Sequence, residues 1–138
     1  MSLLADSLGC MDPQDITNIA QFLKSYWNRS FGIHAHNNKG LALLNSKTAI
    51  DNGASWIDST ILGMGRGAGN VSTESLLIDY EKTLKPKKIH LLNLVRFQKL
   101  KKKYNWGYNP YYHFSAIHKI HPTYVQTLIE DERYKNDN

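Results

Sequence analysis

The feature that most constrains the fold is a threefold alternation between short apolar segments and longer amphipathic ones. The apolar segments are residues 3–5, 30–36 and 55–61, and the amphipathic segments are residues 12–27, 41–51 and 72–82. Each pair takes about 25 to 28 residues, which is the spacing of a strand followed by a crossover helix. The sequence therefore predicts an α/β fold whose strands are parallel and buried on both faces.

The ends of the first two amphipathic segments carry helix boundary signals. Asp12 stands at the expected N-cap, Pro13 takes the first helical position, and Asp15 lies in the first turn. The second segment closes on Asn52-Gly53, where glycine adopts the left-handed conformation without strain. These signals predict a helix for each segment.

Three strands are too few for a closed sheet. Left alone they would have two unpaired edges and one uncovered face. A complete (β/α)₈ barrel takes about 250 residues, whereas this chain has 138. We therefore expect residues 1–82 to be the last three βα units of a barrel, a partial (β/α)₈ TIM barrel that belongs to a longer protein.

The composition changes after residue 82, and residues 83–138 are expected to form a basic and aromatic helical extension. The basic residues that gather around its start are Lys82, Lys85, Lys87, Lys88, Arg96, Lys99, Lys101, Lys102 and Lys103. A helix is predicted around residues 89–100, an aromatic segment over 104–114, and a last helix from Pro122. Aromatic side chains interleaved with Asn and Gly suit two roles, packing against the barrel or stacking on sugars or bases.

Charge and cysteine content narrow the class of protein. The net charge is +5 and the pI about 9.3. The lysine excess lies outside the segment that carries the chemistry and is typical of a solvated helix face, so no nucleic-acid partner is expected. Cys10, the single cysteine, has no partner for an internal disulfide and no setting that would make it a nucleophile. With no apolar run of about 20 residues, we expect a cytoplasmic protein with no membrane partner.

Two histidines are the first candidates for a functional site. His34 and His36 are two residues apart in a predicted strand, so both imidazoles are expected on the same face. They stand at the carboxyl end of that strand, where α/β enzymes place their sites, and two neutral imidazoles can bind a divalent cation. The pair alone is a weak signal. For the remaining histidines we expect surface or capping roles: His90, His113, His118 and His121.

A glycine-rich loop over residues 63–70 connects the third predicted strand to the third helix. Gly65, Gly67 and Gly69 alternate along it, which permits positive φ angles and close approach of the backbone to a ligand. Asn70 precedes the helix, where it suits a cap or a ligand. The spacing also matches a dinucleotide fingerprint, but residues 84–92 contain no acid for the ribose, and no Gly-Lys-Ser or Gly-Lys-Thr follows for a phosphate loop.

The ordered combination of these motifs closely resembles the superfamily of pyruvate aldolases and acyl synthases, whose members include 4-hydroxy-2-oxovalerate aldolase, hydroxymethylglutaryl-CoA lyase and 2-isopropylmalate synthase. The matching segments are Ala5-Asp6-Ser7-Leu8-Gly9, Ile33-His34-Ala35-His36-Asn37-Asn38-Lys39-Gly40, Asn45-Ser46, Gly53-Ala54, Ile57-Asp58, and Gly63 to Asn70 with Glu74. The resemblance covers roughly residues 3–82 and implies a (β/α)₈ barrel enzyme.

The resemblance also implies a metal centre. His34 and His36 would be metal ligands from the seventh strand, with Asn70 as a further ligand and the loop glycines beside the substrate. A divalent ion, Mn²⁺ or Mg²⁺ with Zn²⁺ or Co²⁺ as alternatives, would hold a 2-keto acid and stabilise its enolate as a Lewis acid. The expected activity is that of an aldolase or lyase acting on pyruvate-type substrates.

The chain departs from the family pattern in two ways. The first-strand Asp and the adjacent Arg that complete the family's site have no counterpart here, so the catalytic residues are unknown and the chain alone is expected to be inactive. Another chain is one source for the rest of the barrel. The glycine loop also lacks the cysteine of hydroxymethylglutaryl-CoA lyases, which favours the aldolase or synthase branches. An acyl-CoA-dependent synthase and a non-catalytic chain that binds metal or a partner remain alternatives.

Overall fold

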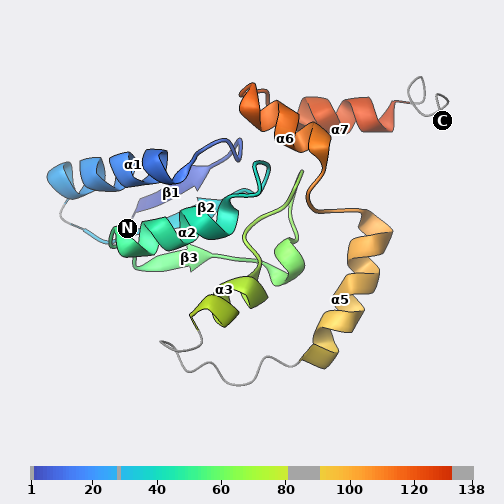
Figure 1. Ribbon diagram of the computed structural model, residues 1–138, viewed down its shortest axis with the longest axis horizontal. Helices are drawn as coiled ribbons and strands as arrows, with labels where there is room; N and C mark the ends of the chain where they lie inside the picture. Colours follow the sequence, from blue (N-terminus) through green and yellow to red (C-terminus); the bar gives the residue numbers. More distant parts are fainter. Residues whose placement is uncertain (1, 28, 81–90, 132–138) are drawn as a thin grey trace.

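The computed structural model describes residues 2–27, 29–80 and 91–131. Within them, three strands form one parallel sheet in the order β1 (Ser2–Asp6), β2 (Phe31–Ala35) and β3 (Trp56–Asp58). The helices α1 (Pro13–Tyr26) and α2 (Ala42–Asp51) connect the strands and lie alongside the sheet (Figure 1). The predicted α/β fold with a parallel sheet is confirmed.

The predicted helix boundaries hold where a capping residue defines them. Asp12 caps α1 by accepting hydrogen bonds from the backbone N–H groups of Gln14 and Asp15. In turn, the Asp15 carboxylate accepts a hydrogen bond from the Asp12 backbone N–H. Helix α2 ends at Asp51, and Gly53 follows with φ 88°. Local sequence therefore determines these ends without help from tertiary contacts.

The third strand and third helix are shorter than predicted. β3 ends at Asp58, and the chain passes through a 3₁₀ turn, η1 (Ile61–Gly63), in which Leu62 has a positive φ of 52°. Helix α3 covers Thr73–Asp79 and is capped by Ser72, so the capping role considered for Asn70 is wrong. The turn follows from a long-range contact, because the Glu74 carboxylate accepts a hydrogen bond from the Leu62 backbone N–H at 3.1 Å.

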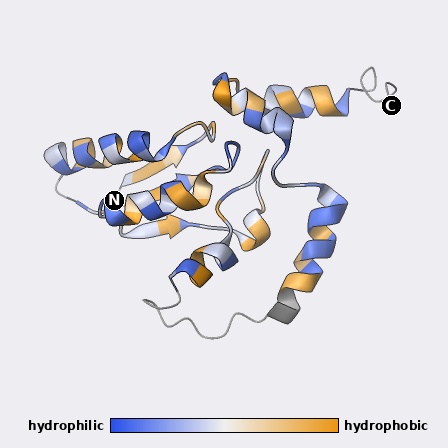
Figure 2. Ribbon diagram, in the orientation of Figure 1, coloured by the Kyte–Doolittle hydropathy of each residue, from blue (hydrophilic) through white to orange (hydrophobic). Residues whose placement is uncertain are grey.

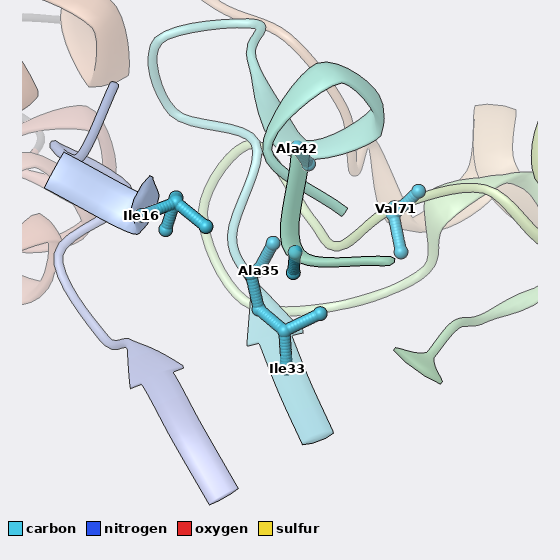
Figure 3. Packing of buried hydrophobic residues seen from close by; sticks show 6 residues of the cluster. Ile16, Ile33, Ala35, Ala42 and Val71 are labelled. Carbon is cyan, nitrogen blue, oxygen red and sulfur yellow. The ribbon is translucent and has the colours of Figure 1, made fainter. Parts of the chain in front are cut away.

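The hydrophobic core lies between the sheet and the two connecting helices. Ile33 and Ala35 of β2 point toward Ile16 of α1 and Ala42 of α2, and Val71 closes the cluster (Figure 3). Leu4 of β1 and Ile57 of β3 pair with Ile33 in the register and pack against the same cluster: the three strands present one face to the helices.

The opposite face of the sheet is open. In strands, alternate side chains point to opposite faces. The strand residues that alternate with the core residues therefore form two cross-strand rows on this open face. These rows are Leu3, Gly32 and Trp56, and Ala5, His34 and Asp58. Leu3 is 47% exposed and Trp56 41% exposed. Apolar side chains on a parallel sheet are normally covered, whereas within the described part of the chain these two are exposed.

The described part of the extension, residues 91–131, contains three helices. It comprises α5 (Leu91–Tyr104), α6 (Pro110–Ile117) and α7 (Pro122–Glu130), which lie beyond the sheet at its glycine-loop side (Figure 1). The hydrophilic colour dominates the second half of α5, whereas α6 and α7 carry broad apolar bands (Figure 2). The described part of the chain has no helix with the length and apolarity to cross a membrane. The division at residues 82 and 83, Lys82, Lys85, Lys87, Lys88 and His90 lie outside the described residues.

Candidate metal centre

His34 and His36 lie on the open face of the sheet, at its carboxyl edge. His34 belongs to β2 and His36 follows it directly. Their ring centroids are 5.0 Å apart and the ring planes are nearly perpendicular, at 81°. The sequence-based expectation that the two imidazoles share a face is therefore confirmed, and they are close enough for one small ion to contact both.

Each imidazole ring has a hydrogen-bond partner in the protein. The Nδ1 atom of His34 lies 3.2 Å from Oδ2 of Asp58, its register partner in β3. The His36 ring hydrogen bonds to the backbone carbonyl of Gly69. When one ring nitrogen donates its proton to an outer oxygen, the other nitrogen presents a lone pair, which is the arrangement found around metal-bound histidines.

The surroundings of His36 favour the neutral form of its imidazole. Burial lowers its pKa below the usual histidine value, and the neighbouring His34 and the Arg66 charge lower it further, while the bond to Gly69 opposes them. A neutral imidazole is the form that coordinates a metal.

Asn70 lies across from His36. The two residues form an isolated antiparallel bridge, and the Asn37 backbone N–H donates to the Gly69 carbonyl at 2.8 Å beside it. Directly paired residues carry their side chains on the same side. The Asn70 amide donates through Nδ2 to the Met64 carbonyl at 3.1 Å, but its buried Oδ1 has no hydrogen-bond partner among the described residues. A buried oxygen without a partner is costly, and a cation would satisfy it.

The loop that carries Asn70 folds back tightly on itself. Gly69 has φ 84°, and a Cβ there would overlap the Gly63 carbonyl oxygen. At Gly65 an added Cβ would lie 2.6 Å from Nδ2 of Asn70. These two glycines allow the loop to close and place the Asn70 amide. Substrate binding by Gly65, Gly67 and Gly69 stays a prediction.

Three residues that sequence analysis gave no role support the site. Asp58 could have been found from the alternation that places it on the His34 face, once the register was known. Arg66 and Glu74 stand within the segments that resemble the family, but the sequence did not show their roles, because these come from folding of the loop. Among the other histidines, His121 caps α7, as expected of a capping residue. The Cys10 thiol has its pKa raised, chiefly by burial and then by Asp6, which agrees with the prediction that it is no nucleophile.

The described residues hold only part of a metal centre. They contain no group of three or more His, Cys, Asp or Glu side chains able to hold one ion. The available donors are two imidazole nitrogens and one amide oxygen, and this set fits a divalent cation that also takes ligands from elsewhere.

A parallel sheet with polar side chains gathered at the carboxyl ends of its strands defines an α/β protein of the kind that binds small ligands at that edge. The HMGL-like family model matches residues 2–100 of this chain. The chain therefore belongs to the HMGL-like family. The family match extends beyond residue 82, where the sequence resemblance was expected to end.

Named relatives and a solved structure agree with this assignment. A 4-hydroxy-2-oxovalerate aldolase from Pelotomaculum thermopropionicum is 44% identical over 79 residues, which are 57% of this chain and 23% of the relative. Another from Geobacillus genomosp. 3 is 47% identical over 74 residues, 54% of this chain and 22% of the relative. The chain thus spans less than a quarter of these curated relatives.

The solved structure covers the extension as well. The N-terminal domain of a putative aldolase from Bacteroides vulgatus superposes with a TM-score of 0.83 and 37% sequence identity. The alignment covers 92% of this chain and 44% of that one. The arrangement of the sheet with the C-terminal helices is therefore shared with another protein.

Replacing Gly69 with alanine should destabilise the chain far more than the same change at Gly40. Both glycines have positive φ, 84° and 74°, but an added Cβ at Gly40 meets nothing within 4 Å. Gly40→Ala should cost about 1–2 kcal/mol from backbone strain alone, and Gly69→Ala several kcal/mol more because its Cβ overlaps the Gly63 carbonyl. Urea denaturation followed by circular dichroism measures both, and equal losses would contradict the loop geometry.

Proposed function

We propose that this chain is part of a divalent-metal-dependent lyase that makes or breaks a carbon–carbon bond next to the keto group of a 2-keto acid. The observation that carries the proposal is the pair His34 and His36, which share the open face of the sheet 5.0 Å apart. In a (β/α)₈ barrel that face is the interior and its carboxyl edge is the site of catalysis. Residues 1–82 would then be the last three βα units.

The proposed ligands are His34, His36 and Asn70. Asp58 and the Gly69 carbonyl orient the two rings, and the unpartnered Oδ1 of Asn70 offers an oxygen from the facing segment. The amide oxygen suits Mn²⁺ or Mg²⁺, whereas imidazole nitrogens also suit Zn²⁺ and other transition ions. The family resemblance favours Mn²⁺ or Mg²⁺, with Zn²⁺ or Co²⁺ as alternatives. When bound, such an ion supplies a Lewis acid that lowers the energy of an enolate oxygen.

The remaining groups would come from outside this sequence. Two imidazoles and an amide are neutral donors, whereas Mg²⁺ is usually held by one or two protein carboxylates together with its substrate. The resemblance to the family implies an Asp and an Arg from the first strand. Either a preceding segment of the same protein or another chain supplies them, and the open sheet face is the surface on which that part would pack.

The aldolase activity is favoured over the alternatives by the names of the relatives. The two curated relatives described above are 4-hydroxy-2-oxovalerate aldolases. The second enzyme class is an acyl-CoA-dependent synthase. No contact among the described residues favours it. The remaining alternative is a non-catalytic chain that binds metal or a partner. It would use the same ligands but would show no turnover.

Mn²⁺ should bind to the wild-type chain through the two histidines. Titration followed by electron paramagnetic resonance should give a saturable signal that the double variant His34→Ala, His36→Ala loses. The variant His113→Ala, in the extension, should titrate like the wild type because it lies outside the site. Equal Mn²⁺ binding by the wild type and the double variant would show that the two histidines are not ligands, and it would contradict the proposed function.

Asp58 should act on the metal through His34. Asp58→Asn keeps the shape of the side chain but removes the charge that holds the His34 Nδ1 proton, so Mn²⁺ affinity should fall about 10–100-fold. Asp51→Asn, an exposed aspartate at the end of α2, is the matched control and should not change the affinity. Isothermal titration calorimetry measures both, and an unchanged affinity for Asp58→Asn would show that Asp58 does not orient a ligand.

The 138 residues alone should release little or no pyruvate from 4-hydroxy-2-oxovalerate in the presence of Mn²⁺, because the first-strand Asp and Arg are missing. Release is followed with lactate dehydrogenase and NADH, and an intact aldolase serves as the positive control. Robust release by the isolated chain would contradict the proposal that its site is incomplete.

A further inference from the structure

A pocket lies where the extension meets the glycine loop. It has a volume of about 270 Å³. Gly65, Arg66 and Gly67 form one side of it, and residues from the end of α5, the segment before α6, and α7 form the other. Neither of the two histidines lines this pocket, so it is a different place from the candidate metal centre.

The pocket is held together by contacts between the extension and the loop. Trp106 donates through Nε1 to the Leu62 carbonyl at 3.1 Å, across 44 positions of sequence. The Tyr112 ring lies against Gly67, where an added Cβ would sit 3.5 Å from two ring carbons, and it joins Ala68 and Val125 in a small core cluster. The packing role predicted for the aromatic segment is thus met by Trp106 and Tyr112, while Tyr104 at the end of α5 stays 65% exposed.

The lining combines flat apolar rings with neutral hydrogen-bonding groups. The amides come from Asn105, Asn109 and Gln126, and the rings from Tyr104, Trp106 and Tyr112. Gln126 hydrogen bonds to the Tyr112 hydroxyl, so its amide is oriented. Aromatic faces offer apolar surface to the C–H side of a ligand, and amides both donate to and accept from hydroxyl groups.

Size and charge decide which ligand fits. Pockets for drug-sized molecules measure about 300–1,000 Å³, so 270 Å³ suits a ligand smaller than a coenzyme. Among the described residues, the charged ones that line the pocket are Arg66 and Glu130, one of each sign. A nucleotide would bring phosphates that this balanced pair cannot neutralise, whereas an uncharged molecule with several hydroxyl groups meets partners on every side.

We propose that this pocket binds a monosaccharide-sized, uncharged polyhydroxy compound such as an aldose, with its ring or chain stacked on Tyr104 and its hydroxyl groups on Gln126 and the neighbouring amides. Arg66 lines the pocket and belongs to the same glycine loop as Asn70, a proposed metal ligand. An aldose carries an aldehyde, so under the proposed function the pocket would deliver the second substrate of an aldol reaction. Only this last step rests on the proposed function.

Binding is tested on the full 138-residue chain with D-xylose, D-glucose and D-mannose, by saturation-transfer difference NMR and calorimetry. EDTA is present throughout, so the result does not depend on the metal centre. At least one aldose should bind, and Tyr104→Ala should weaken it about tenfold or more by removing the stacking surface. Tyr111→Ala is the matched control, since Tyr111 is also 65% exposed but lies outside this pocket.

Gln126→Leu is a second variant, which keeps the apolar bulk while removing the oriented amide, and it should also weaken the aldose about tenfold. Circular dichroism checks that each variant is folded. Adenosine is the competing probe for a base-stacking site. Three results would each overturn the proposal: no binding by any of the three aldoses, binding of adenosine in their place, or equal losses for Tyr104→Ala and Tyr111→Ala. Loss of Mn²⁺ binding with aldose binding intact would instead overturn only the proposed function.

Discussion

The site depends on one buried amide that ties together the loops after all three strands. Asn38, 1% exposed, donates through Nδ2 to the Leu8 carbonyl after β1 and accepts through Oδ1 from the Ala68 backbone N–H in the glycine loop. Buried backbone groups in adjacent loops would otherwise lack partners, and one side chain satisfies two of them at once. Because Asn38 follows His36 closely in sequence, the same segment that carries the histidine also fixes the loop opposite it. The spacing of the candidate ligands is therefore a consequence of how the loops close.

Sequence alone was sufficient for the features that follow from local rules. Alternation along a strand placed His34 and His36 on one face, and a capping aspartate followed by proline defined the start of α1. It was insufficient where the outcome depends on register. Asp58 faces His34 only because β2 and β3 pair with these two residues in line, and a shift by one position would have turned the carboxylate to the core. The alternation within each strand puts Ile57 and Asp58 on opposite faces, but it does not say which residue of β2 each of them pairs with.

The same limit explains the errors around the glycine loop. Residues 55–61 have the composition of one strand, yet the sheet ends at Asp58 because Leu62 is drawn into a positive φ turn whose N–H bonds to Glu74, 12 positions later. The contact of Trp106 with Leu62 spans 44 positions. Helices in the extension could be predicted from proline and apolar spacing, but their docking on the loop could not, since it is made by single hydrogen bonds and a few buried rings.

The open face of the sheet and the neutral donor set have the same physical origin. A barrel interior is formed jointly by strands from the whole sequence. Under the proposed function, three strands alone would leave side chains such as Leu3 and Trp56 exposed, and both are exposed within the described part of the chain. The proposed ligands His34, His36 and Asn70 are neutral donors, which add no negative charge to offset that of a divalent ion. A carboxylate that completed such a site would therefore come from the strands that cover this same side of the sheet.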